Sequence, residues 1–292
     1  MKHLIKSIAL IILLMPCIQS FSSSLYHEGT IKSNRNGTKT IIFIHGLFVN
    51  SETWDEWKVF FEERGYRVLT PDYPGHKGNP SGLRDTIDPS LKSIGFVNVL
   101  DELVKIVEAL PEKPIVVGHS MGGLIVQKLV EMDLVVAGVS IDGAPPKNVK
   151  PPFSTLKAVW PAINFFKSSK HAFIGSKDWY HERFFNTYSK SESDFLFEKF
   201  AVPVSRKLAR ESASSSFAKI DLRKPHQPLL FIGGEKDAIF SEAFTKKVAG
   251  KYKDHMAILD YKAFENRSHF IVGQEGWKEV ALFVHNWLEN LD

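Results

Sequence analysis

The 292-residue sequence contains one cysteine, Cys17, and carries a formal net charge of only +4, from 37 basic and 33 acidic residues. A single thiol excludes an intramolecular disulfide and any zinc or iron–sulfur site built from several cysteines. The charge surplus is too small to favour nucleic acid as a partner, so none is expected. Hydrophobic residues make up 43% and charged residues 24% of the chain. This balance excludes a disordered protein and is typical of a globular enzyme or ligand-binding protein.

The apolar run nearest the N-terminus, residues 8–18, is shorter than the ~20 residues needed to span a bilayer. Lysines precede it and a serine-rich stretch, residues 20–24, follows it. This order predicts a secretory signal peptide, residues 1–24, which leaves residues 25–292 as a periplasmic or secreted domain. The alternatives are a core helix, an uncleaved membrane anchor, and lipidation at Cys17, where the preceding proline is a poor fit.

Apolar, β-rich runs alternate with helical patterns along most of the chain. Strands are predicted over residues 40–44, 66–69, 114–117, 134–141, 229–232 and 256–261. Helices are predicted over residues 54–64, 91–110, 121–132, 241–251 and 277–291. This alternation predicts an α/β fold with a mostly parallel central sheet and helices on both faces. An early edge strand over residues 30–32 and a turn at Asn36-Gly37 are also expected.

Residues 145–224 interrupt this alternation. The segment has little strand pattern and is too long for a loop of a compact domain. We therefore expect a helical cap inserted after the strand that ends near Asp142. Residues 146–224 hold 15 basic and 7 acidic residues and 14 of the 35 aromatic residues. This composition is typical of a site for an apolar or amphiphilic ligand or of contact with a lipid surface. Packing of the cap onto the core is the alternative.

The segment Gly118-His119-Ser120-Met121-Gly122 lies between a predicted strand and a predicted helix. A serine at such a sharp turn is exposed to substrate, and glycines at 118 and 122 avoid clashes with the neighbouring backbone. Backbone N–H groups at the start of the helix can stabilise a developing anion. The pattern predicts that Ser120 is a nucleophile and that His119 is directed away from it.

A serine nucleophile needs a general base and an acidic residue that orients the base. His269 follows the last predicted strand and precedes the final helix, and Asp237 follows the strand before that one. The chain order Ser120, Asp237, His269 is the one expected when the nucleophile lies on such a sharp strand-to-helix turn, the nucleophile elbow. Asp142, at the end of a strand, and Glu235 are the alternatives for the acidic member.

Two backbone donors are expected for the oxyanion. One is the N–H of Met121, directly after the nucleophile. The second comes from the loop after residues 40–44, where Gly46 permits a close turn and either Leu47 or Phe48 offers its N–H. Leu47 is preferred for this role, and Phe48 is expected to contact the substrate. This set of residues implies neither a metal nor an organic cofactor.

Together these motifs make the chain similar to the α/β hydrolases, in particular to lid-bearing serine esterases and lipases. The similar branches are bacterial carboxylesterases, monoacylglycerol lipases and cofactor-free haloperoxidases, and the resemblance covers residues 40–291. It is carried by His45-Gly46, Pro71-Asp72-Tyr73-Pro74-Gly75-His76, the elbow at residues 118–122 followed by Gly123, Gly233-Gly234-Glu235-Lys236-Asp237, and Ser268-His269-Phe270. Lys77 and Ser268 stand where the family usually or often has glycine, and neither change removes a catalytic group.

The resemblance implies hydrolysis of a carboxylic ester through an acyl-enzyme on Ser120, with a small-molecule or lipid-like ester as substrate. Acyl transfer, thioester or amide cleavage and perhydrolysis use the same residues and remain open. Dehalogenase and epoxide hydrolase chemistry is disfavoured, because those relatives carry aspartate at the position of Ser120. A ligand-binding protein on the same fold is the alternative from another functional class. Acyl-chain length and oligomeric state are open at this point.

Overall fold

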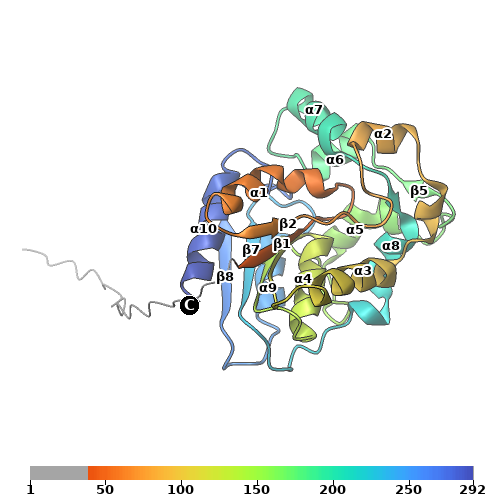
Figure 1. The fold of residues 1–292 in the computed structure, drawn as a ribbon. Coiled ribbons are helices and arrows are strands. Elements are labelled where there is room, and N and C mark those ends of the chain that lie inside the picture. Colours follow the sequence, from red (N-terminus) through yellow and green to blue (C-terminus); the bar gives the residue numbers. More distant parts are fainter. Residues whose placement is uncertain (1–38, 292) are drawn as a thin grey trace, which may run out of the picture. The chain divides into compact units, whose positions relative to one another are not determined.

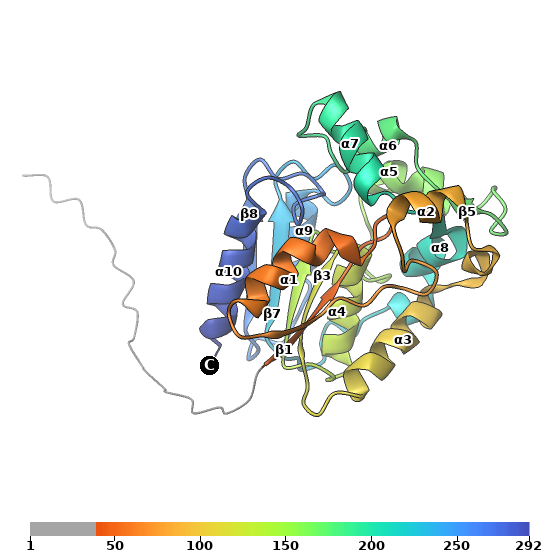
Figure 2. The same ribbon diagram turned by 45° about the horizontal axis from the view of Figure 1, so that its top comes forward.

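The computed structural model describes residues 39–291, so the predicted signal peptide, edge strand and Asn36-Gly37 turn lie outside the described residues. A six-stranded sheet runs through the described part (Figures 1 and 2). Its strands are β1 (Thr40–Ile44), β2 (Arg67–Leu69), β3 (Ile115–His119), β4 (Ala137–Ile141), β7 (Leu229–Gly234) and β8 (Leu259–Phe264). Their order is β2-β1-β3-β4-β7-β8, and every neighbouring pair is parallel. The predicted α/β fold with a mostly parallel sheet is confirmed.

Both faces of the sheet are covered by helices. On one face lie α1 (Asp55–Glu62) and α10 (Trp277–Glu289), and on the other α3 (Phe96–Glu108), α4 (Met121–Glu131) and α9 (Glu242–Ala249). Alternate residues of β1 supply the two cores: Ile41 and Phe43 pack toward the first pair of helices, and Ile42 and Ile44 toward the second group. A strand buried on both faces has no position for exposed polar residues, which explains the continuous apolar runs.

Some element boundaries differ from the prediction. The helix expected over residues 91–110 begins only at Phe96, because the carboxylate of Glu211 accepts the Phe96 N–H at 2.9 Å and a short 3₁₀ turn, Pro89–Ser93, comes before it. The last strand covers Leu259–Phe264 instead of residues 256–261.

Pairing with β7 explains the shift of the last strand. The pairing runs from Leu229 opposite Leu259 to Gly234 opposite Phe264, so β8 takes its register from its neighbour. A further short helix, α2 (Pro80–Asp85), begins after Asn79, whose side chain accepts the Ser81 N–H. The sequence pattern does not predict this helix.

Residues 145–224 fold at the carboxyl end of the sheet (Figure 2). The helices of this segment are α5 (Phe153–Ile163), α6 (Lys177–Arg183), α7 (Lys190–Phe200) and α8 (Arg206–Ser214). An antiparallel pair of two-residue strands, β5 (Ala172–Phe173) and β6 (Val204–Ser205), lies among them. Two residues are too few for an alternating pattern, so the sequence does not predict this pair. No helix within residues 39–291 combines the length and the apolar character needed to cross a membrane.

Candidate active site

Ser120 occupies a strained turn between β3 and α4. Its φ of +56° and ψ of −118° lie in a region that L residues seldom adopt. The flanking glycines allow the backbone to pack this closely. A Cβ on Gly118 would lie 2.2 Å from the Gly122 carbonyl oxygen, and a Cβ on Gly122 would lie 2.2 Å from the Ile44 carbonyl oxygen. Backbone contacts therefore require glycine at both positions.

Three side chains from three strand-end loops meet at this turn. The Nε2 of His269 lies 3.1 Å from the Ser120 Oγ, and its Nδ1 lies 2.7 Å from the Asp237 Oδ2. The side chains of His269 and Asp237 are fully buried. The other carboxylate oxygen of Asp237 accepts the backbone N–H groups of Ile239 and Phe240 at 2.6 and 2.9 Å. The structure thus brings the three predicted residues into one hydrogen-bonded row.

Neither alternative acidic residue bonds to His269 in the described part of the chain. The Oδ1 of Asp142 accepts a backbone N–H at the end of β7 at 2.7 Å, and its Oδ2 is buried without a hydrogen-bond donor. Burial and the neighbouring Asp237 raise the pKa of Asp142 well above its usual value. Glu235 is exposed and accepts the N–H of Asn266 at 2.9 Å. Of the three candidates, Asp237 is the acidic residue that contacts His269.

The expectation that His119 is directed away from the site is wrong. Its ring lies 4.7 Å from the ring of His269, and its Nε2 lies 2.7 Å from the His269 carbonyl oxygen. Burial lowers the pKa of His119 well below its usual value, and the neighbouring His269 lowers it further. Because a carbonyl oxygen can only accept, the neutral ring carries its proton on Nε2. A polar residue at the carboxyl end of a buried strand is the signal that could have found it.

Ser268 and Gln274 hold the loop that carries His269. The Oε1 of Gln274 accepts the N–H of Ser268 at 2.8 Å and its hydroxyl at 3.0 Å. The amide of the same side chain donates to the carbonyl oxygen of Asn266 at 2.9 Å. The serine that departs from the family pattern is therefore a hydrogen-bonding residue here. Gln274 belongs to no motif, so the sequence analysis does not single it out.

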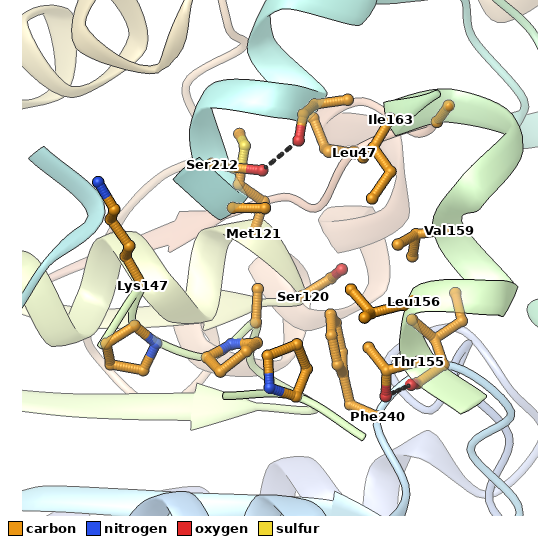
Figure 3. A pocket seen from close by; sticks show the side chains of 18 of the residues that line it. Leu47, Ser120, Met121, Lys147, Thr155, Leu156, Val159, Ile163, Ser212 and Phe240 are labelled. Atoms are coloured by element: carbon orange, nitrogen blue, oxygen red, sulfur yellow. Dashed lines mark hydrogen bonds between the residues drawn. The ribbon is translucent and has the colours of Figure 1, made fainter. Parts of the chain in front are cut away.

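An apolar pocket with a cavity volume of about 100 Å³ opens beside Ser120 (Figure 3). Much of its wall comes from cap helix α5, whose Leu156, Val159 and Ile163 are directed toward this space. Other lining residues are Leu47, Phe48, Met121, Ala209 and Phe240. Lys147 brings a positive charge to the side of the pocket across from α5. The walls suit an apolar group attached to a reacting centre at Ser120.

The predicted oxyanion donors lie at this pocket. Gly46 brings the loop after β1 against Ser120, since a Cβ at this glycine would lie 2.9 Å from the Ser120 Cβ. Within residues 39–291, the backbone N–H groups of Leu47, Phe48 and Met121 donate to no protein acceptor. All three are therefore free to bind an oxygen atom in the pocket. The geometry does not decide between Leu47 and Phe48 as the second donor.

Phe48 links the β1 loop to the cap. Its φ is +71°, and its carbonyl oxygen accepts the Tyr180 hydroxyl at 2.8 Å and the Val202 N–H at 3.0 Å. Its ring packs edge-on against Trp179 and Phe184, with ring centroids 5.0 and 5.9 Å away. The cap therefore fixes both the backbone and the side chain of the residue that is expected to contact substrate.

Buried, neutral histidines also stabilise the loop after β1. The Nδ1 of His45 donates to the Gly46 carbonyl oxygen at 2.7 Å, and its Nε2 accepts the Tyr73 N–H at 3.3 Å. The Tyr73 hydroxyl also donates to the His45 carbonyl oxygen. Burial lowers the pKa of His45 to about 3, helped by the nearby His76, and burial lowers the pKa of His76 to about 4. These bonds hold the loop rigid without placing a charge behind the oxyanion site.

The sequence profile of the alpha/beta hydrolase family matches residues 41–281 of the chain. The chain belongs to this family. Over 116 residues this hydrolase is 32% identical to a non-heme chloroperoxidase from Burkholderia pyrrocinia, and over 114 residues 34% identical to a bifunctional esterase/perhydrolase from Acinetobacter calcoaceticus. Each match covers 38% of this chain. The chain spans about two fifths of the length of these curated relatives, 39% of the first and 38% of the second.

Solved structures of similar fold include esterase- and lipase-like proteins. The hydrolase superposes on tomato methylketone synthase I complexed with 2-tridecanone with a TM-score of 0.65 and 18% identity, covering 88% of this chain and 100% of that one. For a monoacylglycerol lipase from Paleococcus ferrophilus the TM-score is 0.60 and the identity 19%, covering 86% and 95%. For the Arabidopsis methylesterase MES16 the TM-score is 0.63 and the identity 14%, and the match covers 86% of this chain and 99% of that one. At these identities the likeness shows the fold alone.

A possible metal site within the described residues consists of His119, Asp142 and His269. Each offers one atom that could bind a metal ion, and these atoms lie within 4.8 Å of one another. Both ring nitrogens of His269 are already engaged, by Ser120 and Asp237, and the Nε2 of His119 bonds to a backbone carbonyl. A cation here would have to displace these bonds. The group is therefore a hydrogen-bonded network, and the residues do not fit a metal centre.

Proposed function

We propose that this hydrolase cleaves a carboxylic ester through an acyl-enzyme on Ser120. The observation that carries the proposal is the row of Ser120, His269 and Asp237, joined at 3.1 and 2.7 Å beside an apolar pocket. The oxygen of Ser120 attacks the ester carbonyl carbon while the Nε2 of His269 accepts the hydroxyl proton. Asp237 orients the imidazole and stabilises the positive charge that it gains.

The backbone N–H groups of Met121 and Leu47 then stabilise the tetrahedral oxyanion, each lowering the barrier by ~3 kcal/mol. Collapse of this intermediate breaks the bond to the alcohol, which takes the proton from His269. A water molecule, deprotonated by the same base, attacks the acyl group and releases the carboxylic acid. This last step restores Ser120, so each turnover consumes one ester and one water.

The pocket supports an ester whose acyl part is apolar, with Phe48 in contact with the substrate. Perhydrolysis is the second candidate, because one relative is named as a bifunctional esterase/perhydrolase. In that reaction hydrogen peroxide replaces water in the second step and the acyl group leaves as a peracid. Acyl transfer and thioester cleavage would use the same residues with an alcohol as acceptor or a thiol as leaving group.

Hydrolysis of p-nitrophenyl esters from acetyl to palmitoyl tests the proposal, with Ser120→Ala as the matched control. We expect activity that the alanine variant lacks and covalent labelling of Ser120 by a phosphonate probe. Addition of hydrogen peroxide, with an assay for peracid, separates perhydrolysis from hydrolysis. Equal activity of parent and variant, with no labelling, would contradict the proposal and favour a ligand-binding protein.

We also propose that the cap contacts an anionic lipid surface through the outer face of α5. Phe153 and Trp160 lie two helical turns apart on that face and are 81% and 41% exposed. Phe165 and Phe166 follow the helix and are 60% and 91% exposed. The inner face of the same helix lines the pocket. The helix therefore separates the pocket from an apolar outer surface.

The charge of this segment supports an anionic partner. Residues 143–177 contain six lysines and no acidic residue. Lys157, Lys167 and Lys170 are exposed, and within residues 39–291 they form no salt bridge. The guanidinium of Arg210 donates to the Lys167 carbonyl oxygen at 2.5 Å and lies 5.5 Å from the Phe165 ring centroid. Aromatic side chains beside lysines favour the interface of an anionic bilayer.

Vesicle co-sedimentation tests this contact without turnover if the Ser120→Ala protein is used. We expect binding to phosphatidylglycerol vesicles that weakens with salt, and much weaker binding to phosphatidylcholine vesicles. Phe166→Asp should reduce binding by at least about tenfold. Phe195→Asp is the matched control, because Phe195 is 67% exposed on cap helix α7. Equal losses for the two variants, or no preference for anionic vesicles, would contradict the contact.

We propose in addition that the protein is exported by residues 1–24. The support is the order of basic, apolar and small polar residues in the sequence, which lies outside the described residues. The N-terminal sequence of protein purified from its native source tests this proposal, and cell fractionation separates periplasmic, secreted and membrane-attached forms. A mature chain that still begins at Met1 in the cytoplasmic fraction would contradict export.

A further inference from the structure

A second buried carboxyl group lies behind Asp237, and the reaction described above does not use it. Asp142 ends β4 with a φ of +42° and is fully buried. Its N–H donates to the Ile232 carbonyl oxygen at 2.8 Å, and its Oδ1 accepts the Gly234 N–H at 2.7 Å. Its Oδ2 is buried and receives no donor from residues 39–291. The side chain is thus anchored at one oxygen and unpartnered at the other.

The groups that face Asp142 come from four elements of the fold. Asp237, in the loop after β7, is near enough to share a hydrogen bond with it. His119 of β3 and His269 of the loop after β8 each place a ring nitrogen within 4.8 Å of an Asp142 oxygen. Tyr261 of β8 is also close enough to interact electrostatically with an ionised Asp142. No lysine or arginine of the described chain acts on Asp142.

We propose that Asp142 is a neutral carboxylic acid that donates its Oδ2 hydrogen to Asp237 and positions that carboxylate for His269. Two adjacent buried carboxyl groups hold one shared proton more readily than two negative charges. The proton also gives the unpartnered Oδ2 a hydrogen bond, which a buried polar atom requires. The raised pKa of Asp142, caused by burial and by Asp237, agrees with this arrangement.

A neutral Asp142 keeps His269 usable as a base. Its hydrogen bond withdraws negative charge from Asp237 and holds the carboxylate in place. An ionised Asp142 would instead put two negative charges behind the imidazole and favour its protonated form. A protonated imidazole cannot accept the proton of Ser120. This inference rests on the proposed function.

The acid limb of the pH profile of kcat/KM reports protonation of the essential base in the free enzyme, which is His269 in the proposed function. Asp142→Asn keeps the shape and an N–H donor but can carry no charge. We expect its acid-limb pKa to stay within about 0.3 units of the parent value, because the parent side chain is already neutral. If Asp142 is ionised, the same variant loses a nearby negative charge and its acid-limb pKa falls by at least about one unit. That fall would overturn the proposal.

Asp142→Leu keeps the branching at Cγ in a larger side chain, and it removes both the donor and the oxygen that accepts the Gly234 N–H. We expect the acid-limb pKa to rise by about half a unit or more, because the charge of Asp237 is no longer shared. We also expect kcat to fall about tenfold with KM within about twofold, since the pocket is unchanged. A residue that serves only packing would lower stability and leave the acid limb where it was. An unmoved acid limb in the leucine variant therefore contradicts the proposal.

Infrared spectroscopy of the unmodified sequence tests the inference even if both variants fail to fold. In protein labelled with ¹³C at the aspartate carboxyl carbons, a neutral carboxylic acid gives a C=O stretch that carboxylates lack. We expect this band at pH 7.5 in the folded protein and its loss on unfolding, and its absence from the folded protein would overturn the proposal. Because this measurement needs no turnover, it separates failure of the inference from failure of the ester hydrolysis.

Discussion

The Nε2 of His119 lies 2.7 Å from the carbonyl oxygen of His269, and their rings lie 4.7 Å apart. This bond ties strand β3, which leads into Ser120, to the loop that carries His269. Ser120 and His269 are 149 residues apart in the chain, so the distance between them depends on contacts of this kind. The buried, neutral His119, next to Ser120 in the chain, thereby helps to set the position of His269.

Replacement of His119 by alanine should loosen the His269 loop. The buried carbonyl oxygen loses its donor, at a cost of about 1–3 kcal/mol in the free energy of unfolding. We expect kcat for the best ester to fall by about tenfold to hundredfold and KM to change by less than about threefold, because the pocket is intact. Steady-state kinetics and urea denaturation measure both effects. His119→Gln, which keeps a donor, should lose less, and an unchanged kcat in the alanine variant would contradict the role.

Gly122→Ala should be strongly destabilising, because the new Cβ would lie 2.2 Å from the Ile44 carbonyl oxygen. We expect a loss of several kcal/mol or failure to obtain folded protein, since backbone must move. Gly82→Ala is the matched control within helix α2, where a Cβ meets nothing within 4 Å. That variant should be neutral or more stable by up to about 1 kcal/mol. Thermal unfolding of the two proteins compares them directly, and equal midpoints would refute the packing argument.

Val159→Trp should shorten the acyl chain that the enzyme prefers. Val159 lines the pocket from α5 and is half-buried, so an indole has room to extend into the cavity. We expect the ratio of kcat/KM for octanoyl over acetyl p-nitrophenyl esters to fall by at least about tenfold. Val136→Trp serves as control, because Val136 is exposed before β4 and does not line the pocket. A ratio that does not change would place the acyl group elsewhere.

The described chain should be less stable at pH 5.5 than at pH 7.5. Burial lowers the pKa of His45 to about 3 and that of His76 to about 4, and it lowers the pKa of His119 well below 6.5. Below pH 6.5 these histidines therefore bind more protons in the unfolded chain than in the folded one. Each of them lowers the free energy of unfolding by up to about 1.4 kcal/mol for every unit by which the pH is lowered.

The raised pKa of Asp142 acts in the opposite direction, because its contribution is lost as pH rises. Between pH 5.5 and 7.5 the three histidines together contribute up to about 4 kcal/mol and the one carboxyl group at most about 2.7 kcal/mol in the opposite direction, so the net change over the interval keeps its sign. Urea denaturation at several pH values measures the slope, and His76→Gln should flatten it by the share of one histidine. A midpoint that is equal or higher at pH 5.5 would contradict the prediction.

Local sequence was sufficient for the order of the central strands and the helices that flank them, because each buried strand is an apolar run and each of these helices has an amphipathic pattern. Strand β1 has the predicted bounds, Thr40–Ile44, whereas β8 is shifted to Leu259–Phe264. The edge strand alternates exposed and half-buried residues, so its own pattern marks its ends poorly, and pairing with β7 sets them. The two-residue strands of the cap depend in the same way on a partner about 30 residues away.

The sequence by itself determined the α/β fold, the turn at Ser120 and the chain order of the three candidate catalytic residues, whose roles stay predictions. These features are encoded locally, in apolar runs and in glycines that a sharp turn requires. Only the tertiary structure decided that His269 bonds to Asp237 and not to Asp142, that His119 bonds to the His269 carbonyl oxygen, and that a buried carboxyl group lies next to the pair. Those relationships join residues far apart in the chain, and they exist only where parallel strands bring their carboxyl ends to one edge of the sheet.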